Sequence, residues 1–401
     1  MPDTPKLLSR EFIVLCLILV AAFANVSVFY SFYHYLGTIG IPLEWRGFIV
    51  GLEPMAAFML RLFVIPWIST RNAVSILLIS LVLIVIVSCS YLWALTVPAM
   101  IMLRIVHGTA FVLLTSAVIA LIVQFIPREK SGQGFSIITI STMVPYAVIP
   151  TVTETLLPYV QSEADIYSGV SIFSVISILL LVLLKKRLKR VLGKLDEALG
   201  RRPRLEEIKE NFKQIPVVLL LTCAFLVYLA HATVFYFTKD LALESSIGNL
   251  GSFFTISMLT MIVVRLAGSS IFDKTNKLYV FLASLALLIL CLVLLSHAGS
   301  RFYFYLLAGL YGVCMGIILP LLNALLFTAS PPPLRGLNTN LTLFTMDAGY
   351  FIMPYTGGLI IAVGCKFNIL FYLAAAFILF SLLFVLLLIR FQRKIKNNRI
   401  H

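Results

Sequence analysis

Charged residues are scarce in this sequence. Only 12% of its 401 residues are Asp, Glu, Lys or Arg, whereas 61% are hydrophobic. Soluble domains carry about 25% charged residues, and a soluble fold could not bury so much apolar surface. This composition excludes an ordinary water-soluble protein and indicates a chain that is solvated by lipid.

Signatures of metal binding and catalysis are also missing. The six cysteines are scattered and form no C-x-x-C pair, which argues against a metal centre or a disulfide framework. The sequence has no H-E-x-x-H, G-x-S-x-G or P-loop motif, and no long polar segment that could fold as a nucleotide-binding domain. We therefore expect no enzyme, no cofactor and no metal, and any active process should be driven by an ion gradient.

Apolar runs long enough to cross a bilayer, about 20 residues each, fill most of the chain. The sequence predicts twelve spans, at 11–36, 47–68, 74–95, 99–124, 134–158, 166–184, 216–238, 249–272, 278–297, 302–328, 337–363 and 368–390. The connections are short except for 185–215. The prediction is an all-α integral membrane protein. An N-terminal six-helix bundle covers 1–184, a basic central loop covers 185–215, and a C-terminal six-helix bundle with a tail covers 216–401.

Positive charge lies mainly on one side of these predicted spans. If both tails are on that side, it holds 24 of the 31 Lys and Arg residues; three lie inside spans, and the other four are in the opposite loops, at Arg46, Lys239, Arg301 and Lys366. Such an excess marks cytoplasmic loops, so we expect both termini in the cytoplasm of a cell with the protein in its inner membrane. The 11 basic residues of the central loop should rest on anionic headgroups rather than bind nucleic acid.

The two halves of the sequence repeat each other. "SVFYSF" (27–32) matches "TVFYFT" (233–238) at a distance of 206 positions. At a distance of 204 positions the matching residues are Arg61 and Arg265, Gly108 and Gly312, Gly132 and Gly336, and Pro150 and Pro354. The near-constant offset predicts two parallel six-span repeats with a site between them, near the bilayer midplane.

Ionisable residues inside spans are costly and are therefore candidates for function. Asp347 lies near the predicted midplane, in a span that glycines and Pro354 should loosen, and it is a candidate carrier of a coupling proton; the alternative is a fixed hydrogen bond to a neighbouring helix. Glu53 and Arg104 lie at matching depths and could form an ion pair, which serves either coupling or packing. Glu154 is expected at the membrane interface.

Histidines and aromatic residues supply further candidates. His107 and His231 could take part in proton coupling, with structural hydrogen bonding as the alternative. The candidates for a substrate cavity are Asn25, Phe29, Tyr30, Phe235 and Tyr236. Some of these aromatic residues could instead belong to an interfacial belt.

The stretch "VRLAGSSIFDKTNK" (264–277) resembles the loop signature of the major facilitator superfamily, R-x-x-x-G-x-x-x-D-R-x-G-R, through Arg265, Asp273 and Lys274. The long Arg265 side chain could reach the interface near Asp273, and Asp273 precedes the N-terminus of the next helix, where a negative charge is favoured. We predict that these residues and Arg61 form a cytoplasmic gate; the alternative is that the arginine anchors a span end.

Two further stretches resemble the same superfamily. "RIVHG" (104–108) resembles its R-x-x-q-G motif, and residues 335–358 are similar to the tenth-to-eleventh-span region of its drug and sugar efflux branches. Two departures stand out: Ser69 occupies the Asp position of the first-half signature, and span five keeps Pro145 but lacks the glycines of the antiporter motif.

The resemblance implies solute transport by alternating access. We predict a monomeric secondary transporter that exports a small organic solute, amphipathic ones included, as an antiporter that uses protons. Proton-coupled uptake of a metabolite stays open because it would show the same features. The alternative from another class is a membrane enzyme or lipid-handling protein without coupled transport.

Overall fold

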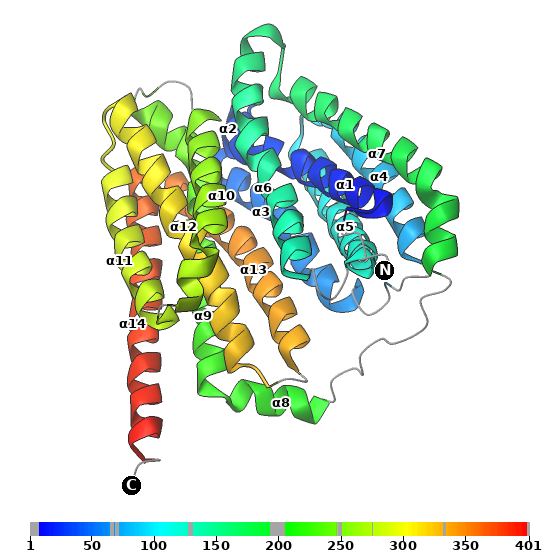
Figure 1. Ribbon diagram of the computed structural model, residues 1–401. Helices are drawn as coiled ribbons and strands as arrows, with labels where there is room; N and C mark the ends of the chain where they lie inside the picture. The colour runs from blue at the N-terminus through cyan, green and yellow to red at the C-terminus, as the bar shows by residue number, and fades with distance from the viewer. Residues whose placement is uncertain are drawn as a thin grey trace. The chain divides into compact units, whose positions relative to one another are not determined.

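The computed structural model describes residues 8–64, 68, 72–126, 131–192, 205–245, 247, 251–274, 276–331 and 334–398. Every regular element within these ranges is a helix, which confirms the predicted all-α class. The chain divides into two compact units (Figure 1), unit 1 (Met1–Leu199) and unit 2 (Gly200–His401).

Unit 1 is built from long helices that correspond to the first six predicted spans. They are α1 (Arg10–Ser27), η1 (Val28–Ser31) and α2 (Phe32–Thr38), α3 (Leu43–Val64), α4 (Ala73–Ser90), α5 (Val97–Ile122) with η3 (Val123–Phe125), α6 (Ser131–Leu156) with η5 (Leu157–Tyr159), and α7 (Glu163–Leu192). Helix α5 packs on α1, α3 and α4, while α1 also packs on α6 and α7, and α4 on α7.

Unit 2 has the same plan after a short first helix. Its helices are α8 (Leu205–Lys213), α9 (Ile215–Glu244), α10 (Gly251–Lys274), α11 (Lys277–Leu295), α12 (Arg301–Ala329), α13 (Arg335–Ala362) and α14 (Phe367–Asn398). Helix α12 packs on α9, α10 and α11, while α9 also packs on α13 and α14, and α11 on α14. These are the pairings of unit 1 transferred to the matching helices, so the sequence repeat is also a repeat of packing.

Two glycines show this repeat at atomic detail. A Cβ atom on Gly108 of α5 would lie 2.2 Å from the carbonyl oxygen of Glu53 in α3, and one on Gly312 of α12 would lie 2.4 Å from the carbonyl oxygen of Ser257 in α10. Any larger side chain would collide with backbone at either place. Glu53 and Ser257 are themselves separated by the repeat offset, so the close helix approach occurs at equivalent points of both units.

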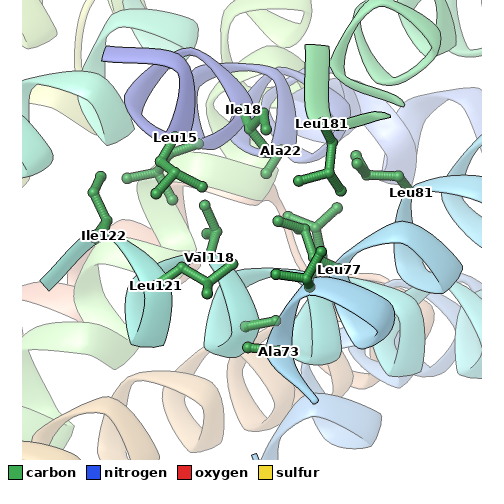
Figure 2. Close-up of a cluster of buried hydrophobic side chains, with 14 of the residues drawn as sticks. Leu15, Ile18, Ala22, Ala73, Leu77, Leu81, Val118, Leu121, Ile122 and Leu181 are labelled. Carbon is green, nitrogen blue, oxygen red and sulfur yellow. The ribbon is translucent and has the colours of Figure 1, made fainter. Parts of the chain in front are cut away.

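Aliphatic side chains fill the core of unit 1. Figure 2 shows Leu15 and Ile18 of α1 facing Leu77 of α4, Val118 of α5 and Leu181 of α7, and all five are buried. The four helices therefore meet at one apolar cluster.

Nine of the described helical segments are long and apolar enough to cross a membrane. The three remaining predicted spans correspond to α3, α10 and α13, and the apolar part of α10 is a shorter stretch, Gly251–Ala267. The protein is thus a multi-pass membrane protein by the length and composition of its helices, while the count of twelve spans stays a prediction.

The predicted central loop is partly helical. Helix α7 continues past the predicted end at 184 to Leu192, and its Arg187 forms an ion pair with the buried Glu11 of α1. Helix α8 is joined to α13 by a reciprocal pair of amides, in which Asn211 donates to Asn338 at 2.6 Å and Asn338 donates back at 3.1 Å. Both ends of the segment are therefore attached to their own unit.

Two predictions about helix ends are wrong. Three of the four basic residues assigned to the opposite loops lie in helices instead: Arg46 in the first turn of α3, Lys239 near the end of α9, where it is buried, and Arg301 at the start of α12. Asp273 and Lys274 lie in the last turn of α10, and the residue that caps α11 is Asn276, whose side chain accepts from the Leu278 amide at 3.2 Å. The described cap at the N-terminus of α11 is therefore Asn276, and the side chain of Asp273 lies outside the described part.

Candidate functional site

Arg104 is the centre of a buried polar group in unit 1. It lies in α5 and is only 1% exposed. Its Nη2 donates to the carbonyl oxygen of Val50 at 3.0 Å and lies 3.5 Å from Oε2 of Glu53, which is 6% exposed. The two residues that the sequence placed at matching depths are therefore in contact, as an ion pair between α3 and α5.

Aromatic rings cover the guanidinium group of Arg104. Its Cζ lies 5.2 Å from the ring centroid of Phe29 and 4.7 Å from that of Phe32. Cation–π contacts of this kind strengthen when water is excluded, and both rings are buried. Phe29 is thus a wall of the Arg104 site within unit 1.

His107 lies one helical turn beyond Arg104 on α5 and is fully buried. Its Nδ1 and the hydroxyl of Tyr91, the residue that follows α4, form a hydrogen bond of 3.3 Å, and its ring packs against Phe29 at a centroid distance of 5.1 Å. Its Nε2 has no hydrogen-bond partner among the described residues. The cluster therefore holds an acid from α3, a cation and an imidazole from α5, and a phenol from the C-cap of α4.

The remaining cavity candidates of unit 1 make contacts within the unit. Asn25 donates to the carbonyl of Ala21 at 2.7 Å and to Oγ of Ser174 in α7 at 3.0 Å, and it is 1% exposed. It therefore ties α1 to α7. Tyr30 of η1 donates its hydroxyl proton to Oε1 of Glu154 at 2.5 Å, so Glu154 is a half-buried partner of η1.

Glu163 is a buried acid that the sequence reasoning missed. It lies at the start of α7, outside the predicted span, and its Oε2 accepts from Ser31 at 2.6 Å and from Tyr167 at 2.9 Å. The signal that could have found it is the Glu–Tyr spacing of four residues, which places both side chains on one face of a helix.

Asp347 is the central acid of unit 2. It lies in α13, is 5% exposed, and interacts electrostatically with Tyr228 of α9. Arg265 of α10 interacts with the same tyrosine. The carboxyl predicted near the midplane is therefore buried in a group that also contains a phenol and a cation.

Glycines of α13 bring this helix against α9. A Cβ atom on Gly349 would lie 2.9 Å from the backbone carbon of Tyr228, and one on Gly357 would lie 2.9 Å from the ring of Phe237. The helix runs unbroken from Arg335 to Ala362 with Pro354 inside it. In this structure the helix is unbroken and Gly349 and Gly357 allow close packing on α9, while the expectation that the glycines and Pro354 loosen the helix stays a prediction.

His231 and the aromatic candidates of unit 2 form one cluster. His231 of α9 is hydrogen-bonded through Nδ1 to the Tyr311 hydroxyl of α12 and stacks on that ring. Tyr350 of α13 lies next to Phe235, Tyr236 and His231, with centroid distances of 5.9, 5.8 and 5.9 Å. The structure therefore gathers these candidates around Tyr350, which the sequence analysis did not single out.

The predicted gate residues are only partly covered by the described side chains. Arg61 lies in the last turn of α3 and Arg265 in the second half of α10, and both are half-buried. The side chains of Asp273 and Lys274, and Ser69 as a whole, lie outside the described part. Among the described residues, no group of three His, Cys, Asp or Glu side chains could hold a metal ion.

The sequence of this chain matches the model of a known protein family. A family model described as Major Facilitator Superfamily matches residues 12–352 and 220–400. No curated protein sequence matches the chain.

Three solved structures illustrate the similarity of fold. The nucleoside transporter NupG is 13% identical, with a TM-score of 0.74 over 94% of this chain and 98% of its own. A POT family transporter in complex with a thioalcohol-conjugated peptide is 15% identical, with a TM-score of 0.73 over 96% of both chains. An inward-facing, unoccupied bacterial homologue of the human lysosomal transporter Spinster is 12% identical, with a TM-score of 0.70 over 96% of both chains. At these identities the likeness is one of fold, and it confirms the predicted membrane fold.

Proposed function

The chain belongs to the major facilitator superfamily, and on that premise we propose that it exports a small organic solute across the cell inner membrane in exchange for protons. Membership makes it a membrane transporter of a small solute rather than an enzyme. Transport by alternating access between two repeats requires no cofactor, and we propose that the monomer is the working form.

The buried carboxyl of Asp347 carries the proposal of proton coupling. An acid that is 5% exposed, on a membrane helix, is costly to keep charged, so a change in its surroundings shifts the balance between its charged and neutral forms. Tyr228 lies within electrostatic range of Asp347, and Arg265 interacts with the same tyrosine, so these two residues provide such surroundings. Glu53, Arg104, His107 and His231 are the second set of candidates, because the first three are buried and His231 is half-buried.

Two observations bear on the direction of transport and on the class of substrate. The similarity of residues 335–358 to efflux branches favours export, whereas the aromatic cluster around Tyr350 favours a solute with an apolar or ring-shaped part. Two of the proteins with a similar fold are named for nucleoside transport and for a bound peptide conjugate. We propose an organic metabolite as the substrate, and uptake of such a metabolite is the competing outcome.

A vesicle experiment tests the proposed function. A metabolite-wide comparison of a deletion strain with its parent identifies the compound that changes, and that compound is then offered to everted membrane vesicles. Export coupled to protons predicts accumulation when the vesicle lumen is acidified and loss of accumulation when a protonophore is added. Accumulation only in right-side-out vesicles would show uptake, and transport indifferent to the pH gradient would remove proton coupling.

We also propose that both termini and the segment 185–215 are cytoplasmic, with a gate of Arg61, Arg265, Asp273 and Lys274 on that side. Native Cys365 is exposed between α13 and α14, at the opposite ends of these helices from the tail. In intact cells an impermeant maleimide should label Cys365.

The same reagent should not label Lys213→Cys in a Cys365→Ser background until the cells are permeabilised. Lys213 has a well-exposed side chain, 71% accessible, so a missing label there reports sidedness and not burial. Labelling of position 213 without permeabilisation would reverse the orientation.

A further inference from the structure

The first long helix of unit 1 changes geometry in its middle. Helix α1 ends at Ser27, the 3₁₀ turn η1 covers Val28–Ser31, and α2 resumes at Phe32. Breaks in helices normally coincide with Pro, Gly or an inserted side chain. Neither Pro nor Gly occurs from 25 to 33, so side-chain contacts have to stabilise this turn.

Two carboxylates bind consecutive residues of the turn. Tyr30 donates to Oε1 of Glu154 at 2.5 Å, and Ser31 donates to Oε2 of Glu163 at 2.6 Å. Both distances are at the short end of the range for hydrogen bonds between oxygen atoms. Ser31 has φ −104° and ψ 12°, outside the helical region, so the bond to Glu163 is made by the residue at which the helix changes.

The second unit provides a comparison within the same chain. The residues that match Ser31 and Glu163 are Phe237 and Phe367, whose rings are in contact at a centroid distance of 6.2 Å. The residue that matches Glu154 is Gly358. Helix α9 runs through this region without a break. The 3₁₀ turn therefore occurs in the unit that has the two carboxylates and not in the unit that lacks them.

The turn determines where two aromatic rings lie. Side chains three residues apart eclipse each other in a 3₁₀ helix, and Phe29 and Phe32 are three apart, with ring centroids separated by 5.2 Å. Both rings lie over Arg104. In unit 2 the residue matching Arg104 is Ala308, so the arginine and the turn occur together.

We propose that Glu154 and Glu163 are positioning residues that hold the 3₁₀ turn and thereby present Phe29 and Phe32 as a two-ring seat for Arg104. A 3₁₀ residue turns the chain about 20° further than an α-helical one, so converting four residues to α-helix would rotate α2 by roughly 80°. Phe32 would leave the guanidinium. That the two rings over Arg104 matter for transport rests on the proposed function. That Glu154 and Glu163 stabilise the 3₁₀ turn does not depend on it.

Distance measurements between spin labels test this role without any substrate. Labels replace Leu17 of α1 and Thr38 of α2, which are both exposed, in a background without native cysteines. Glu163→Gln keeps an oxygen that can accept from Ser31 and Tyr167, so the distance distribution should match that of the parent. Glu163→Met has a similar size and no such acceptor, so the distribution should shift by several ångström.

A second pair of variants keeps the test decisive if Glu163→Met does not fold. Ser31→Ala removes the donor, whereas Ser27→Ala removes a buried hydroxyl that donates only to the carbonyl of Ala24 in its own helix. A shift in Ser31→Ala together with an unchanged distribution in Ser27→Ala supports the proposal. Equal distributions in all variants, or equal shifts in Glu163→Gln and Glu163→Met, would overturn it whatever the protein transports.

Discussion

Asp347→Asn is expected to abolish proton-driven accumulation of the substrate while exchange of substrate across the membrane continues. Asparagine has nearly the same shape and still forms hydrogen bonds, but it cannot bind or release a proton at accessible pH. The carboxyl is 5% exposed and interacts with Tyr228, so a change in its charge acts on buried groups of unit 2 rather than on solvent. Coupling should therefore fail without loss of the fold.

The size of the effect follows from the gradient. A pH difference of one unit is worth about 1.4 kcal/mol per proton, which supports a concentration ratio of about ten for one coupled proton. Vesicles with the parent protein should approach this ratio, whereas those with Asp347→Asn should stay near a ratio of about one. Counterflow of labelled against unlabelled substrate should be retained.

Two control variants distinguish the loss of a titrating carboxyl group from a disturbance of the fold. Asp165→Asn makes the same chemical change at the start of α7, where the carboxylate accepts from the amides of Gln161 and Ser162 at 3.0 and 2.9 Å, and it should leave coupling unchanged. Asp347→Glu keeps an acid and should retain part of the accumulation. Uphill transport by Asp347→Asn with the parent's pH dependence would contradict the prediction and move the proton site to Glu53, His107 or His231.

The helices of this protein could be predicted because lipid imposes a simple requirement. A chain that crosses a bilayer has to satisfy its backbone hydrogen bonds internally, so long apolar runs become helices. The errors lie at helix ends, where this requirement no longer applies. Hydropathy reports where lipid ends and not where a helix ends, which is why α7 extends to Leu192 and α9 includes Lys239.

The depth of a side chain along its helix could be predicted from the sequence, whereas the side of the helix that meets a given neighbour could not. Glu53 and Arg104 were paired from their distances to the span ends, because every helical residue advances by about 1.5 Å. Helix α5 is apolar on nearly all sides, so its sequence does not indicate which face meets which neighbour. For the same reason the sequence does not show that Asn25 contacts Ser174 or that Phe29 lies over Arg104.

The 3₁₀ turn could not be predicted from local sequence. Its residues include no helix breaker, and the acids that bind it come from α6 and α7, more than a hundred residues away. Sequence patterns of one segment cannot show a geometry that distant side chains impose. The repeat could have indicated it, because the matching segment in α9 has phenylalanine where Ser31 binds Glu163.

Arg104→Met is expected to destabilise unit 1 strongly, because it leaves the Glu53 carboxylate buried without its cation. Breaking a buried ion pair from one side costs about 3–5 kcal/mol. Methionine occupies similar space along the stem of the arginine but has no donor for Val50 and no charge over Phe29. Thermal unfolding of the purified protein in detergent should show the largest loss of stability for this variant.

The second half of the pair gives the matched comparison. Glu53→Gln should cost less, since Arg104 keeps its bond of 3.0 Å to the Val50 carbonyl and its two aromatic contacts. The double variant Glu53→Gln with Arg104→Met removes both charges and should recover most of the stability lost in Arg104→Met alone.

Arg104→Lys separates charge from shape in the same site. Lysine keeps the positive charge near Glu53, but it lacks the planar guanidinium that lies over Phe29 and Phe32 at 5.2 and 4.7 Å. Its stability should fall between those of the parent and Arg104→Met.

If Arg104→Met unfolds at the same temperature as the parent, the pair contributes nothing to stability. A loss of transport in that stable variant would assign Arg104 to the transport step itself. If the double variant is less stable than Arg104→Met, the two charges are not coupled and the contact of 3.5 Å is incidental.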